Sequence, residues 1–219
     1  MRRGRAAALV LLAAAAAAGC ATAPPHDYAA YRAHYPHSIL VLPPENQTVD
    51  VTASYDYLAT ITRPLAEAGY YVFPVAVVDA FMKENGLPTP AEMHAVSLAK
   101  LREVTGADAV LYVTIEEWGQ KYRIISSDTV VRARARLVDV ATGATLWSGT
   151  AEGYRSSAAG QSDPFAMLLA AVLTQVLSGP SDPAHQLART ANHTMVFDQR
   201  SGLLLGPRHP RAAEDLRGR

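Results

Sequence analysis

The chain has 219 residues, of which 49% are hydrophobic and 18% are charged, with 20 basic and 20 acidic side chains. This composition is typical of one folded domain, alone or with short additions, and it excludes a disordered tail. A balanced charge without a basic cluster gives no indication of nucleic acid as a partner. The chain has one cysteine, so no disulfide can form within it and its stability must come from a hydrophobic core.

The first 19 residues are expected to be a cleavable export signal. Met1 to Arg5 is cationic, and the apolar run from Ala6 to Ala18 is shorter than the roughly 20 residues of a membrane-spanning helix. Gly19 and Cys20 resemble a lipobox, in which small residues admit a signal peptidase and the cysteine thiol receives a diacylglycerol. We therefore predict cleavage between Gly19 and Cys20 and lipidation of Cys20. Ala17 stands where lipoboxes usually have leucine, so cleavage elsewhere in the alanine run is the alternative.

Residues 20–37 are interpreted as a lipidated tether. They contain three prolines and show neither helical nor alternating periodicity. The segment after Cys20 nowhere approaches 18 consecutive apolar residues, so the lipid is expected to be the membrane anchor. Three aromatic residues of this segment could also dock on the folded body: Tyr28, Tyr31 and Tyr35.

Residues 38–200 are expected to form one α/β domain. Ser38 to Pro44 is a short apolar run closed by prolines, which is typical of a central strand buried on both faces. Helical spacing over residues 54–68 is followed by a second strand at Tyr70 to Pro74, and a helical pattern then runs from Val75 to Lys83. This alternation predicts parallel strand pairing with right-handed crossovers.

A strong helix start comes next. Thr89 and Glu92 can form a capping box around Pro90, and the helical pattern continues to Gly106 with an interruption near residues 96–97. Ala107 to Trp118 is then predicted as a strand whose far end is polar.

Glu116 and Glu117 stand next to each other at that polar end. Neighbouring residues of a regular strand point to opposite faces of a sheet, so we do not expect these two carboxylates to form a catalytic pair.

Residues 122–150 are predicted to form an antiparallel meander with a turn at residues 141–143. Trp147, in the last strand, is interpreted as a core aromatic residue. Arg132, Arg134 and Arg136 alternate with apolar residues and should share one wet face. Such a row could bind a carboxylate, a phosphate or a glycan; alternatively, it is an ordinary solvated face paired with acidic neighbours on adjacent strands.

Two C-terminal helices are predicted after Asp-Pro pairs, from Asp163 to Gly179 and from Asp182 to about Phe197. Residues 201–219 are expected to be a tail. The tail contains an apolar patch that could cover a sheet edge or contact a partner chain: Leu203, Leu204 and Leu205. The predicted fold class is therefore α/β, a mixed sheet with helices packed on it: a β-α-β-α start, an antiparallel meander and two C-terminal helices.

Catalytic and metal-binding motifs are missing from the sequence. We find no Gly-x-Ser-x-Gly elbow, no phosphate loop and no second cysteine. The seven histidines include no His-Glu-x-x-His, and His185 and His193 are eight residues apart, too far to share an ion without a third element. We predict that the protein is not an enzyme and has neither a metal nor a cofactor.

Several segments resemble a known family: residues 62–75 (TRPLAEAGYYVFPV), residues 106–112 (GADAVLY), and Leu-Val-Asp at 137–139 with Thr142-Gly143 and Leu146-Trp147. From about Ser38 to Pro210 the chain is similar to bacterial lipoproteins of unknown function typified by a Neisserial surface lipoprotein antigen. The hairpin with Leu-Val-Asp and Leu-Trp is more loosely similar to CsgG-like and TolB amino-terminal-like domains. The resemblance implies a mixed-sheet α/β fold, a periplasmic setting at the outer membrane and dimers, and it supplies no catalytic residues.

The predicted function is that of a lipid-anchored, non-enzymatic interaction module in a secretion or transport assembly of the envelope. Ala21, in place of an aspartate, favours sorting to the outer membrane, either on its periplasmic side or exposed at the surface. Expected partners are the membrane, through the lipid, and envelope proteins, with a CsgG-like lipoprotein or a second copy of the chain as candidates. The alternatives are a glycan- or small-ligand-binding protein that uses the arginine row, and an accessory subunit of a transporter.

Overall fold

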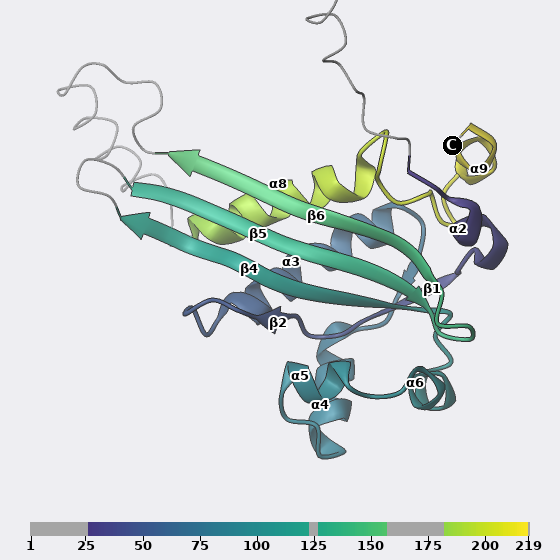
Figure 1. The fold of residues 1–219 in the computed structure, drawn as a ribbon, viewed down its shortest axis with the longest axis horizontal. Helices are drawn as coiled ribbons and strands as arrows, with labels where there is room; N and C mark the ends of the chain where they lie inside the picture. Colours follow the sequence, from purple (N-terminus) through teal and green to yellow (C-terminus); the bar gives the residue numbers. More distant parts are fainter. Residues whose placement is uncertain (1–25, 123–126, 157–181, 219) are drawn as a thin grey trace, which may run out of the picture.

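The computed structural model describes residues 26–122, 127–156 and 182–218. The expected signal, Gly19, Cys20 and the helix predicted from Asp163 to Gly179 lie outside these ranges. The described strands form one mixed sheet in the order β3-β1-β4-β5-β6, with the short β2 also paired to β4 (Figure 1). The predicted α/β class with a mixed sheet is confirmed.

The first half of the sheet is parallel. β1 (Ser38–Val41) lies between β3 (Tyr71–Val72) and β4 (Ala109–Tyr122), and β2 (Glu45–Asn46) pairs with β4 further along. Alternate residues of β1 enter two different cores, Ile39 on one face and Leu40 on the other. β1 is therefore buried on both faces, as its continuous apolar sequence predicted.

The second half is the predicted antiparallel meander of β4, β5 (Ser127–Asp139) and β6 (Thr145–Ser156). The turn between β5 and β6 is held by the Asp139 carboxylate, which accepts hydrogen bonds from the backbone N–H and the hydroxyl of Thr142 at 2.7 and 2.6 Å. Gly143 follows with φ = 77°, a left-handed conformation that glycine adopts without strain.

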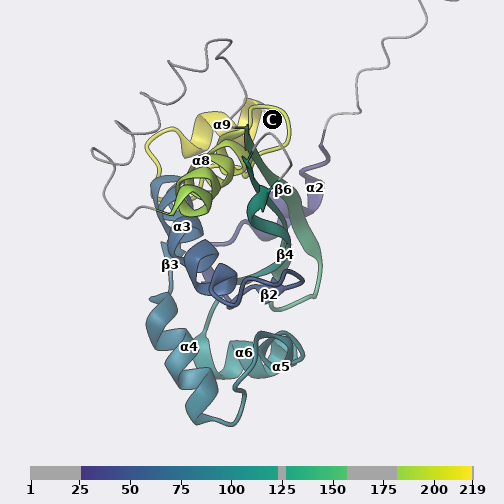
Figure 2. The same cartoon turned by 90° about the vertical axis from the view of Figure 1, so that its left-hand side faces the viewer.

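One face of the sheet is covered by two helices, α3 (Ala53–Glu67) and α8 (Pro183–Phe197) (Figure 2). α8 begins where the sequence predicted: the Asp182 carboxylate accepts a hydrogen bond from the backbone N–H of Ala184 at 2.9 Å. Trp147 is buried in this layer and its indole N–H donates to the carbonyl of Ser201 at 2.6 Å. Trp147 is therefore a core residue, as expected.

The other face is covered at the parallel half by three short helices, α4 (Val75–Glu84), α5 (Pro90–His94) and α6 (Leu98–Thr105). Met93 of α5 and Leu101 of α6 pack with Leu40 and Val110 in a second apolar cluster. The capping box of Thr89 and Glu92 starts α5, and Ser97 caps α6, so the predicted interruption of the helix is present.

Residues near the amino terminus belong to the folded body. Tyr28 and Tyr31, beside and within α2 (Ala29–His34), are buried. The hydroxyl of Tyr28 donates to the carbonyl of Gly202 at 2.6 Å, and that of Tyr35 donates to the carbonyl of Leu205 at 2.6 Å. The body therefore begins before residue 38, which corrects the predicted extent of the tether and shows that its tyrosines dock.

The predicted tail is also part of the core. Leu203, Leu204 and Leu205 are 2%, 0% and 8% exposed, so they are unavailable to a partner chain. The Tyr70 hydroxyl donates to the carbonyl of Leu204 and accepts from Tyr31 at 2.5 Å. We call this set of contacts between α2, Tyr70 and residues 202–205 the tyrosine clasp. A last helix, α9 (Ala212–Gly218), follows it, so the domain extends past residue 200.

None of the helices in the described ranges is both long enough and apolar enough to cross a membrane.

Candidate functional site

The three arginines of β5 lie on the face of the meander opposite α3 and α8. Their neighbours Val131, Ala133, Ala135 and Leu137 are buried in the core beneath, so the alternation turns Arg132, Arg134 and Arg136 outward. All three arginines are exposed. The predicted common face of the arginine row is confirmed; we call it the arginine face.

Glu116 and Glu117 also point to the arginine face, contrary to the prediction that they would point to opposite faces. The pairing of β4 with β5 shifts here, from Ile115 opposite Ala133 to Glu117 opposite Arg132. Ile115 and Trp118 are both buried in the same core, so the two residues between them turn outward. This is a β-bulge, which adds one residue to a strand and resets its alternation.

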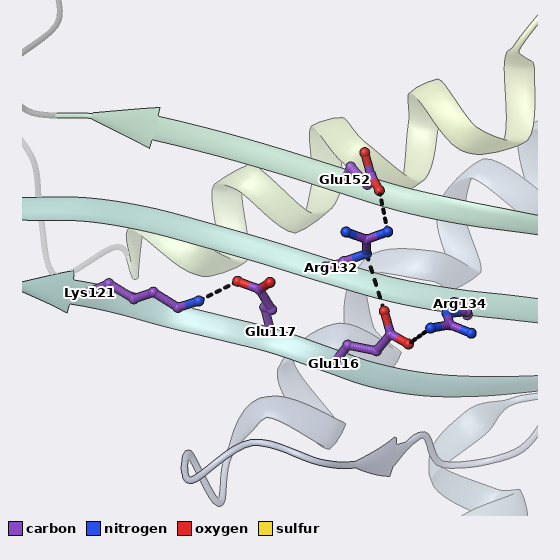
Figure 3. Close-up of polar contacts among 6 residues, drawn as sticks. All are labelled: Glu116, Glu117, Lys121, Arg132, Arg134 and Glu152. Carbon is purple, nitrogen blue, oxygen red and sulfur yellow. Dashed lines mark hydrogen bonds and ion pairs between the residues drawn. The ribbon is translucent and has the colours of Figure 1, made fainter.

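The acidic residues pair with most of the cations of the arginine face (Figure 3). Glu116 contacts Arg132 at 3.2 Å and also contacts Arg134. Arg132 reaches a second carboxylate, that of Glu152 on β6, at 3.1 Å. For Arg132 the interpretation as a solvated, cross-strand ion pair fits the structure. Such exposed pairs contribute only about 0–1 kcal/mol each to stability.

Glu117 pairs along its own strand with Lys121. The hydrogen bond and the positive charge of Lys121 lower the pKa of the Glu117 carboxyl group. The carboxyl group of Glu117 is therefore not raised in pKa as a general acid would require, and both carboxylates of the bulge are held in ion pairs with cations.

Arg136 differs from the other two arginines because no carboxylate of the described residues pairs with it. Its register partners are Tyr112 on β4 and Ser148 on β6, whereas Arg132 stands opposite glutamates on both sides. The guanidinium carbon of Arg136 lies 5.0 Å from the centroid of the Tyr112 ring, a cation–π contact.

A groove of about 710 Å³ lies beside Arg136, between the sheet and the helices α5 and α6. Its size falls within the range of small-ligand sites. We call the side formed by β4, β5 and β6 the floor, and the side formed by β2, α5 and α6 the wall. The lining includes Tyr112, Arg136 and Ser148 on the floor, and Glu45, His94 and Leu98 on the wall. We call this the Arg136 groove.

His94 joins the wall to the floor of the Arg136 groove. Its ring lies edge-on to Tyr112 at 5.2 Å, its Nε2 is 2.9 Å from the carbonyl oxygen of Pro43, and its Nδ1 is 3.5 Å from Glu45. Because a carbonyl only accepts, Nε2 carries the proton. Burial lowers the pKa of His94 and outweighs the raising effect of Glu45. Sequence spacing does not reveal this cluster, since its residues lie far apart in the chain.

A second groove, of about 1050 Å³, runs between α3 and α8 and includes both His185 and His193. Two of its charged residues are paired with each other, since Arg63 donates to Glu67 at 2.7 Å, and Arg189 also lines it. The described residues contain no group of three or more His, Cys, Asp or Glu side chains that could hold a metal ion. The Arg136 groove is the stronger candidate site, because its unpaired cation is held over the Tyr112 ring, which His94 also contacts.

Known proteins resemble the chain over most of its length. The family model described as "Putative lipoprotein GNA1162-like" matches residues 26–208. The protein named "Putative lipoprotein NMB1124/NMB1162" of Neisseria meningitidis serogroup B is 43% identical over 187 residues, which cover 85% of this chain and 87% of that protein.

A solved structure of the same family also matches. The crystal structure of lipoprotein GNA1162 from Neisseria meningitidis is 48% identical, with a TM-score of 0.54, and the match covers 64% of this chain and 98% of that one. The PelC dodecamer from Paraburkholderia phytofirmans is 20% identical with a TM-score of 0.41, and the match covers 78% of this chain and 92% of that one. The looser CsgG-like and TolB-like resemblance is not confirmed by this family match. The chain belongs to the GNA1162-like lipoprotein family.

Proposed function

We propose that the protein is a lipid-anchored module at the periplasmic side of the outer membrane, which acts through protein contacts and not through catalysis. Its membership of a lipoprotein family supports the anchor at Cys20. The expected partner is an envelope protein of a secretion or transport assembly, with a CsgG-like lipoprotein as the candidate.

The tyrosine clasp is the observation that carries this proposal. Tyr28 is only eight residues beyond Cys20, so the intervening chain spans at most about 28 Å when fully extended. Tyr28 itself is 3% exposed and hydrogen-bonded to residue 202. A lipid on Cys20 would therefore keep the end of the molecule with α2 close to the bilayer, and the body could not drift away on a long tether.

The opposite end of the sheet then faces away from the membrane. The loop of residues 47–52 follows β2, which runs parallel to β4, and lies at the far end of the sheet from α2 (Figure 1). Val49 and Val51 in this loop are 101% and 86% exposed. The loop has a defined shape, because Asn46 donates to the carbonyl of Asp50 at 2.6 Å and accepts from the backbone of Thr48 at 2.9 Å. We assign the partner contact to this valine loop.

A photo-crosslinking side chain at Val51 tests the proposal in intact envelopes. The same side chain at Glu214, exposed on α9 at the membrane-facing end, is the matched control. We expect position 51 to give an adduct with an envelope assembly protein, identified by mass spectrometry, and position 214 to give none. Recovery of only free monomer from position 51 would contradict the proposal, as would equal adducts from both positions.

A further inference from the structure

Arg136 carries a positive charge that the fold does not neutralise. Arg132 contacts two carboxylates and Arg134 shares one of them, while no carboxylate of the described ranges pairs with Arg136. A guanidinium stacked on an aromatic ring keeps the N–H donors at its edge available for a planar anion. The Tyr112 ring thus supports Arg136 without using its hydrogen-bonding capacity.

Unused hydroxyl groups lie next to this guanidinium and next to the neighbouring Arg134. The strand register places Ser148 beside Arg136, and Thr114 and Thr150 on either side of Arg134. All three hydroxyl residues line the Arg136 groove, and none of their hydroxyls has a hydrogen-bond partner within the part of the chain that the structure describes. The floor of the groove therefore offers both charged and neutral donors to an anionic group, the combination that recognises a carboxylate.

The wall of the groove carries the opposite charge. Glu45 lines the same groove, and its near neighbour His94 is kept neutral by burial at neutral pH, so His94 does not cancel the Glu45 charge. A doubly charged phosphate would be repelled by Glu45, whereas a ligand with both a negative and a positive end would be attracted by Arg136 and Glu45 together.

We propose that the Arg136 groove binds a small zwitterion of the amino-acid or short-peptide type, with its carboxylate on Arg136 and its ammonium group on Glu45. This site does not depend on the lipid anchor or on the valine loop. Of the three arginines that were predicted as a possible ligand-binding row, the proposal assigns the ligand contact to Arg136.

Calorimetric titration of the full chain in detergent micelles with the dipeptide alanyl-alanine tests the proposal. Arg136→Gln should weaken binding by about tenfold or more, because hydrogen bonds between two charged groups are stronger than those between neutral groups. Arg132→Gln is the matched control: it removes the same charge from the same strand face, but that arginine is already paired, so affinity should change by less than about twofold. Arg136→Lys, which keeps the charge and loses the planar fork, should be intermediate.

Modified probes separate the two ends of the ligand. Capping the carboxylate as an amide should abolish binding, and acetylating the amine or introducing Glu45→Gln should weaken it. Inorganic phosphate should bind more weakly than the dipeptide. Near-UV circular dichroism of each variant should match the unmodified protein, since the replaced side chains are exposed or half-exposed.

Three results would overturn the proposal: no heat of binding with millimolar dipeptide, equal affinity of the Arg136→Gln variant and the unmodified protein, or tighter binding of phosphate than of dipeptide. Equal binding of the acetylated and free dipeptides would overturn the assignment of Glu45.

Discussion

Single residues on the arginine face have different environments although they are chemically alike. Arg132 and Arg136 differ by four positions on one strand, yet one lies between two glutamates and the other on a tyrosine ring. The bulge at Glu116 causes part of this difference, because it brings a second carboxylate to the same face. The strand register, as well as the residue type, therefore decides which arginines of this surface are paired with carboxylates.

His94 gives a prediction for the pH dependence of stability. Burial, opposed by Glu45 and reinforced by Arg136, lowers its pKa in the folded protein. As the pH falls below about 6.5, the unfolded chain takes up a proton that the folded protein resists, so folding stability should decrease. From about pH 7.5 to about pH 5.5, the free energy of unfolding measured with urea should fall more for the unmodified protein than for His94→Gln. Equal losses would mean that His94 is not responsible.

At the level of elements, α8 packs closely on β6 because small residues face it. A Cβ atom on Gly149 would lie 2.3 Å from the Trp147 ring and 3.0 Å from Met195 of α8. A Cβ atom on Gly153 would lie 2.5 Å from Leu187. Glycine at these positions thus provides room for the indole and the helix, and a tryptophan fixed by its hydrogen bond to Ser201 cannot easily move.

Gly149→Ala should consequently destabilise the protein by about 1–3 kcal/mol, the usual cost of overpacking a core. Denaturant unfolding measures this loss. Ser148→Ala, the adjacent change on the exposed face of β6, should stay within about 0.5 kcal/mol of the unmodified protein. If both variants were equally stable, the close packing around Trp147 would not limit this position.

For the molecule as a whole, the tyrosine clasp joins the two ends of the chain. Residues 28–35 and 202–205 are separated by most of the sequence, yet hydroxyl-to-carbonyl hydrogen bonds join them, a buried one from Tyr28 and a part-buried one from Tyr35. Breaking such a bond in the core destabilises the fold, because leaving a buried carbonyl without a donor costs about 1–3 kcal/mol. If the amino terminus is anchored, the clasp would therefore hold the whole folded body close to that anchor.

Cys20→Ser should release the protein from the membrane fraction into the soluble periplasm, since the substitution removes the thiol that would carry the lipid. Cell fractionation followed by immunoblotting makes the comparison, with Ala21→Ser as a variant that keeps the cysteine. Persistent membrane association of the Cys20→Ser protein would show that another feature anchors it.

The sequence alone determined most of the longer elements and which face of β5 is exposed. Continuous apolar residues indicated the central β1, alternation indicated the outward arginines of β5, and capping residues located the starts of α5 and α8. Each of these signals is local, because it depends on backbone periodicity or on a hydrogen bond within one turn. The family could be recognised for a similar reason, from short motifs.

Only the tertiary structure decided which residues meet. The burial of Tyr28 and Leu204 depends on contacts between opposite ends of the chain, and no local pattern specifies such contacts. The bulge at Glu116 depends on how β4 pairs with β5, so strand alternation predicted the wrong face. The Arg136 groove likewise combines Glu45, His94 and Arg136 from three separate elements. Long-range packing creates these sites, since it brings together side chains whose positions in the sequence are unrelated.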